Sequence, residues 1–103
     1  MGWANHAIEA LSEGRAAVVK PHGGSMRPKV ESGATVTLEP TTVNEVQVGD
    51  IVLCRVKGNV MLHLVKALRG SDDKRSALIG NNVGRINGWT RTIYGRVVEV
   101  RNP

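Results

Sequence analysis

The sequence predicts a mainly β fold: a small bent sheet or partly open β-barrel with one short N-terminal helix. The 103 residues are enough for one modest core. Because there is no Phe and only 3% of the residues are aromatic, that core must rest on aliphatic and β-branched side chains, which suit strands. Short apolar runs separated by glycine-rich turns point the same way. We expect one domain over residues 1–103, with the helix in 1–15 and the β domain in 16–103.

The helix is predicted near the N-terminus. Trp3, Ala7, Ile8 and Leu11 follow helical spacing, and Gly14 provides a stop. The polar side of this helix carries glutamates where an anionic lipid surface favours Lys or Arg. We therefore expect the helix to dock on the domain rather than on a membrane.

Strands are expected where short segments rich in β-branched residues lie between turn residues. Lys57-Gly58-Asn59 is typical of a hairpin turn. A charged loop is predicted over 70–75, and an extended turn region over 80–88. The predicted strands, five or six in number, come from segments 16–19, 36–39, 51–56, 60–68, 76–79 and 93–100.

Several classes of protein are excluded by composition. The single cysteine, Cys54, lies in an apolar run and is expected to pack as a small hydrophobic residue. One cysteine rules out an internal disulfide, and the three histidines lack zinc-site spacing, so we expect no metal and no other cofactor. No run of about 18 apolar residues and no secretory leader pattern occurs. We expect no integral membrane segment and a cytoplasmic location.

The net charge of +5 raises the question of nucleic acid. However, the fourteen basic residues are spread from Arg15 to Arg101, with almost no aromatic residues among them to stack on bases. We therefore expect a peptide or protein to be the main partner. Nucleic-acid binding is a weaker alternative that rests on charge alone, and homodimer formation is left open.

The segment with most chemical interest is Gly23-Gly24-Ser25-Met26-Arg27-Pro28. Its glycines allow a close approach of backbone to substrate, and Pro28 stiffens the exit of the turn. A serine hydroxyl is a poor nucleophile until a nearby base accepts its proton. Turn serines commonly do no more than satisfy local backbone donors, so a catalytic interpretation needs further motifs.

Three later segments supply those motifs: Val48-Gly49-Asp50-Ile51-Val52, the run from Val60 to Leu68, and Gly80-Asn81-Asn82. With the serine box, this order of motifs resembles the signal peptidase and LexA-type repressor superfamily, peptidase families S24 and S26. The resemblance implies a β domain of that type and a serine endopeptidase that acts on an extended peptide. It further implies Ser25 as nucleophile, the Ser25 amide as oxyanion donor, and Met26 and Pro28 as substrate-binding residues.

The base is predicted to be His63, with Lys66 as the rival. Bacterial members of the superfamily mostly use lysine, whereas His63 falls where eukaryotic and archaeal signal peptidases have histidine. The two residues are three positions apart, which on a regular strand places them on opposite faces unless a bulge intervenes. We expect His63 to face Ser25, with partial burial lowering its pKa, and Lys66 to reach solvent. The alternative is a structural histidine in a half-buried sheet.

Two departures from the family pattern favour a second hypothesis. Gly33-Ala34 replaces the usual Gly-Asp, and Asn81 stands where the histidine-type members carry an acidic residue. Asn81, as orienting residue, can hydrogen-bond an imidazole but cannot stabilise its cation as a carboxylate does. The second hypothesis is a catalytically weak or inactive peptide-binding or assembly module. LexA-type self-cleavage is not expected, because the chain contains neither Ala-Gly nor Cys-Gly.

Overall fold

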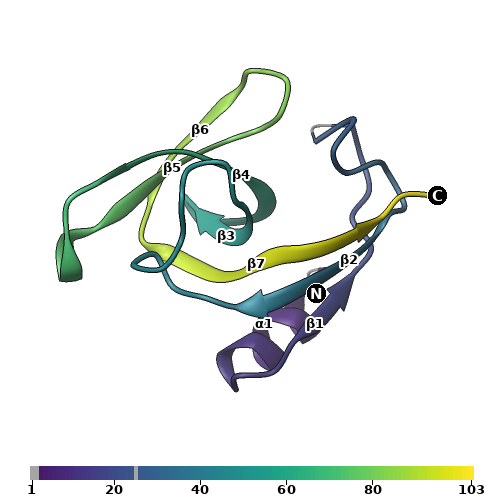
Figure 1. The fold of residues 1–103 in the computed structure, drawn as a ribbon, viewed down its shortest axis with the longest axis horizontal. Helices are drawn as coiled ribbons and strands as arrows, with labels where there is room; N and C mark the ends of the chain where they lie inside the picture. The colour runs from purple at the N-terminus through teal and green to yellow at the C-terminus, as the bar shows by residue number, and fades with distance from the viewer. Residues whose placement is uncertain (1–2, 25) are drawn as a thin grey trace.

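The computed structural model describes residues 3–24 and 26–103, and Figure 1 shows their fold. Over these residues, seven antiparallel strands form one open sheet in the order β1-β2-β7-β3-β4-β5-β6, with a short helix before the first strand. The predicted mainly β, bent-sheet class with one N-terminal helix is therefore confirmed. The elements are α1 (Asn5–Ser12), β1 (Ala17–Val19), β2 (Thr35–Pro40), β3 (Ile51–Val56), β4 (Asn59–Arg69), the 3₁₀ helix η1 (Asp72–Lys74), β5 (Ser76–Gly80), β6 (Ile86–Thr90) and β7 (Thr92–Arg101).

The sheet is strongly curved. Register shifts interrupt the pairing of β7 with β2 and β3, and of β5 with β4 and β6. Each such bulge bends its strand and increases the local twist. As a result the β5–β6 hairpin curls away from β1 and β2, and β6 returns to contact β3 (Figure 1).

Two hydrophobic cores lie on the two faces of the sheet, and β3 contributes to both. Leu53 belongs to the core that also holds the apolar side of α1, while its neighbours Val52 and Cys54 belong to the core beneath the β5–β6 hairpin. This alternation follows from the two-residue period of a strand. Cys54 is fully buried, and burial raises the pKa of its thiol to about 12, so it packs as the predicted hydrophobic residue.

The segment between β1 and β2, residues 20–34, forms a loop pinned to the first core. Met26, Val30 and Ala34 are all buried there, at a spacing of four residues. Backbone hydrogen bonds from Val30 N to Met26 O and from Gly33 N to Pro21 O close the loop on itself, each at 2.9 Å. A loop that carries its own buried anchors is well suited to hold a functional turn in a fixed place.

The sequence-based prediction missed one strand. Residues 80–88 were expected to form a turn, but β6 begins at Ile86 and pairs with β5. Asn87 and Gly88 interrupt the β-branched pattern that predicts strands, which is why this edge strand was not recognised. The predicted hairpin was correct: Lys57 and Gly58 have φ values of 52° and 84°, as a two-residue type I′ turn requires.

The helix is docked on the sheet, as predicted. Figure 1 shows α1 beside β1 and β2, and Leu11 on the helix contacts the site of Gly95 on β7. A Cβ on Gly95 would lie 2.9 Å from a Leu11 methyl and 2.8 Å from Glu39 O, so this packing requires glycine. None of the helices in the described ranges has the length and apolar character needed to cross a membrane.

Candidate active site

A cavity of about 340 Å³ lies between the 20–34 loop and the first half of β4. Its apolar lining comes from Met26 and Val30 of the loop, Met61 and Leu62 of β4, and Trp3 beside the helix. Polar groups stand at its border, where His22 is exposed and His63 is half-buried. An apolar hollow with a few convergent polar groups is the usual form of a small binding site.

The imidazole of His63 is held by a neighbour on β6. His63 Nδ1 lies 2.7 Å from Asn87 Oδ1, so Nδ1 carries the proton that this amide oxygen accepts. In the neutral ring the lone pair is then on Nε2, which makes Nε2 the basic atom. Burial lowers the pKa of His63, the nearby charge of Arg85 lowers it further, and the hydrogen bond to Asn87 partly opposes both effects.

Asn81, predicted as the orienting residue, has a different role in the structure. Its Oδ1 accepts hydrogen bonds from Val83 N at 3.0 Å and Arg85 N at 2.9 Å, and its side chain is buried. These contacts close the turn between β5 and β6, as asparagine side chains often do. The residue that orients His63 is Asn87, six positions further along the chain.

Lys66 does not line the cavity that His63 lines. A bulge falls at Lys66, where the β4–β5 pairing shifts between Val65 and Ala67. The lysine side chain crosses Gly80 on the neighbouring strand, with Cγ and Cε 3.1 Å from the place of a Cβ on that glycine. Lys66 is therefore half-buried rather than fully extended into solvent.

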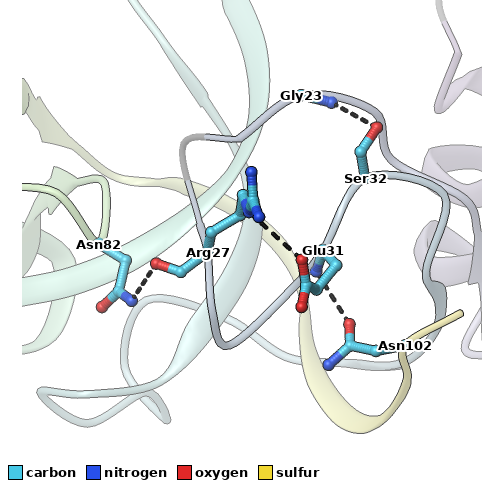
Figure 2. A network of polar contacts seen from close by, with 6 residues as sticks. All are labelled: Gly23, Arg27, Glu31, Ser32, Asn82 and Asn102. Carbon is cyan, nitrogen blue, oxygen red and sulfur yellow. Dashed lines mark hydrogen bonds and ion pairs between the residues drawn. The ribbon is translucent and has the colours of Figure 1, made fainter.

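The 20–34 loop is tied to two distant parts of the chain, as Figure 2 shows. Asn82 Nδ2 donates to Arg27 O at 2.8 Å, which joins the loop to the β5–β6 turn, and Asn102 Oδ1 accepts from Glu31 N at 2.9 Å. Within the loop, Ser32 Oγ accepts from Gly23 N at 3.0 Å, and Arg27 pairs with Glu31. The described residues around the serine turn are therefore restrained by two distant parts of the chain and by contacts within the loop.

Of the sequence-predicted site residues, the structure brings His63 and Met26 to one cavity. Met26 is only 4% exposed and forms part of the floor, whereas Pro28 is exposed and does not line the cavity. Ser25 lies outside the described residues; Gly23, two positions before it, and Met26, directly after it, both line this cavity. In the described part of the chain, no group of three or more His, Cys, Asp or Glu side chains is placed to hold a metal ion.

The structure therefore combines a curved antiparallel sheet with one cavity that is lined by the 20–34 loop and by a half-buried histidine. The model of the Peptidase S24-like family matches residues 5–86. The chain therefore belongs to the Peptidase S24-like family. A comparison with curated proteins found no match.

The family match covers the serine turn, His63, Lys66 and Asn81, but it ends at Ile86, one residue before Asn87. Sequence reasoning also missed Asn87, because residues 80–88 were assigned to a turn. The period of β6 alone would not have revealed it, since Asn and Gly are uncommon in strands. The pairing of β5 with β6 brings Asn87 to His63, and that pairing is a property of the folded sheet.

Proposed function

We propose that this domain is a serine endopeptidase that acts on an extended peptide, with Ser25 as nucleophile and His63 as general base. The observation that carries the proposal is the cavity: Gly23 and Met26, which lie two residues before and one residue after Ser25 in the sequence, line it together with His63. Membership of the Peptidase S24-like family supports the same reaction class. The lowered pKa of His63 supports the base, because the imidazole is neutral and able to accept a proton near pH 7.

The reaction proceeds by acyl transfer. Ser25 Oγ forms a bond to the scissile carbonyl carbon while its proton passes to His63 Nε2. The carbon–nitrogen bond then breaks as the imidazolium donates that proton to the leaving amine. Water, activated by the same imidazole, hydrolyses the acyl-enzyme and regenerates the serine.

The lining of the cavity supports a preference for substrates with an apolar side chain next to the scissile bond. Trp3, Met26 and Leu62 offer that side chain a hydrophobic environment. The peptide backbone is expected to add to a sheet edge. The β6 edge supports this arrangement, because β6 is the outermost strand of the sheet formed by the described residues and carries Asn87 next to His63.

A second candidate function is a peptide-binding module with little or no catalytic activity. The specific observation in its favour is the amide of Asn87 at the position where a carboxylate would stabilise the imidazolium. In a serine protease, replacing that carboxylate by an amide lowers kcat about 10⁴-fold. Slow turnover is therefore expected even if the chemistry is retained.

The test is a search for new peptide N-termini after incubation of a peptide library with wild-type protein or with Ser25→Ala. The proposal expects cleavage by wild type, after or before apolar residues, and no cleavage by Ser25→Ala. Cleavage that persists in Ser25→Ala would rule out the nucleophile. If wild type binds peptides without cutting them at high protein concentration, the binding-module function replaces the peptidase.

A further inference from the structure

The positive charge of the chain is concentrated in one part of the fold. Between Lys66 and Arg91 the sequence has six basic and two acidic residues, whereas the rest of the chain has eight basic and seven acidic residues. This segment comprises the end of β4, the 3₁₀ helix, β5 and β6. Most of the net positive charge, which looks scattered in the sequence, is therefore carried by residues 66–91. The basic residues are Lys66, Arg69, Lys74, Arg75, Arg85 and Arg91.

Three of these cations gather around an exposed indole. Arg69, Lys74 and Arg91 line a shallow depression of about 520 Å³ together with Trp89. Trp89 remains 36% exposed, although the Arg69 guanidinium carbon lies 4.0 Å from the centre of its ring. Arg69 Nε also donates to Ser76 Oγ at 3.3 Å, so this stacked pair is held in place. We call Arg69, Lys74, Trp89 and Arg91 the Trp89 patch.

The cations of the Trp89 patch are not neutralised by ion pairs in the described part of the chain. The ion pairs there join Arg15 to Glu13, Arg27 to Glu31 and Arg101 to Glu99, all outside the patch. By contrast, the guanidinium of the half-buried Arg75 donates hydrogen bonds to the backbone carbonyl oxygens of Val43 and Val46. The patch cations are exposed and available to an external anion.

The register of the strands adds an apolar strip to this charged surface. Leu78 lies opposite both Ala67 and Trp89, and directly paired residues share one face of a sheet. Ile86, which is 52% exposed, pairs with Gly80, two residues from Leu78, and so lies on the same face. An exposed apolar strip with an aromatic ring, bordered by cations, is complementary to a polymer in which aromatic bases are joined by phosphate groups.

We propose that the Trp89 patch binds single-stranded nucleic acid, with Arg69, Lys74 and Arg91 on phosphates and Trp89 stacked on a base. An acidic peptide would be attracted by the same cations, but it offers no ring to the indole. A duplex likewise keeps its bases stacked on each other. The contribution of Trp89 to binding affinity therefore distinguishes a single-stranded nucleic acid from an acidic peptide and from a duplex. This activity is independent of Ser25 and His63.

The experiment measures fluorescence anisotropy of a short labelled oligothymidine over a series of salt concentrations. Arg69→Gln/Arg91→Gln is expected to weaken binding about tenfold or more, and to reduce the salt dependence by about 0.7 in slope per cation removed. The matched control, Arg15→Gln/Arg101→Gln, removes the same charge from exposed positions outside the patch and should retain most of the affinity. Peptide hydrolysis should be the same for both double variants.

The aromatic contact is tested with a second pair of variants. Trp89→Leu is expected to weaken oligothymidine binding roughly tenfold without a change in salt slope, while Trp89→Phe, which keeps a ring, retains most of it. Thermal unfolding followed by circular dichroism checks that each variant is folded. The proposal is overturned if wild type does not bind at low salt, or if the control double variant loses as much affinity as the patch variant. It is also overturned if polyglutamate or duplex DNA binds as tightly and Trp89→Leu has no effect.

Discussion

At the scale of single residues, the hydrogen bond between His63 and Asn87 sets the tautomer of the imidazole, on which the proposed mechanism depends. Asn87 fixes the ring so that Nε2 is the basic atom, but as a neutral amide it does little to stabilise the protonated ring. Arg85 acts in the opposite sense to a carboxylate, since its charge lowers the pKa of His63. The site is therefore ready to accept a proton but is a weak base.

Asn87→Asp should raise peptide hydrolysis. A carboxylate at this position stabilises the imidazolium that forms during attack, and each ~1.4 kcal/mol removed from the barrier is a factor of ten, so we expect a gain of at least about tenfold. Asn81→Asp is the matched control, because its side-chain oxygen can still accept from Val83 N and Arg85 N and does not contact His63. Equal gains from both variants would show that Asn87 has no special role.

The pH dependence of activity follows from the lowered pKa of His63. If His63 is the general base, it acts in its neutral form, so kcat/KM should rise with pH and reach half its maximum below pH ~6.5, the ordinary value for histidine. Below that midpoint the rate should fall about tenfold per pH unit. A midpoint well above pH 7 would instead indicate a lysine base. The measurement is a pH profile of wild-type hydrolysis with a cleaved library peptide.

Stability should depend on the same group. The folded pKa of His63 is lower than the unfolded one, so the unfolded chain binds more protons between the two values. The contribution of the neutral ring is fully present above pH ~6.5 and is lost as the pH falls through the folded pKa. Urea unfolding at pH 5 and pH 8 should therefore show a smaller pH effect for His63→Gln than for wild type. An equal pH effect in both proteins would contradict this assignment.

At the scale of elements, the 20–34 loop depends on contacts made by other parts of the chain. The hydrogen bond from Asn82 to Arg27 O links the serine turn to the same β5–β6 hairpin that carries Asn87 (Figure 2). The two halves of the site are thereby positioned by one hairpin. A change in that hairpin should affect catalysis more than stability.

Asn82→Ala tests this link. Loss of one hydrogen bond should lower the free energy of unfolding by about 1 kcal/mol. Hydrolysis should fall by a larger factor, because the turn loses part of its restraint. The control is Asn44→Ala in an exposed loop, which should change stability by less than about 0.5 kcal/mol and leave the rate unaltered. If the two variants have the same kcat, the hairpin does not position the turn.

Local patterns in the sequence predicted most elements but not the one that completes the site. The helix, the Lys57-Gly58 hairpin, the strands from β1 to β5 and the final strand β7 were recognised because turn residues and β-branched runs are local signals. The β6 strand was missed because Asn87 and Gly88 weaken its pattern, and it is stabilised by pairing with β5. The bulge at Lys66 could not be predicted from the sequence either, since it depends on the register between β4 and β5.

At the scale of the whole molecule, the curvature of the sheet shapes both the cavity beside His63 and the surface of the Trp89 patch. It brings β6 to His63 at one place and gathers the cations of the Trp89 patch at another. The sequence indicated the family through four ordered motifs, and the match to Peptidase S24-like domains confirms it. It did not indicate the distribution of charge, because Arg69 and Arg91 are brought together only by the folded hairpins.

The most direct test of the central claim is a single-turnover cleavage assay of wild type, Ser25→Ala, His63→Gln and Lys66→Gln on one library peptide. Each protein is first shown to be folded by circular dichroism. If Ser25 and His63 form the catalytic pair, Ser25→Ala and His63→Gln lose cleavage at least about 10³-fold, while Lys66→Gln, which keeps the Cγ methylene that packs over Gly80, cleaves at nearly the wild-type rate. Cleavage that survives in His63→Gln and disappears in Lys66→Gln would contradict the account and assign the base to the lysine.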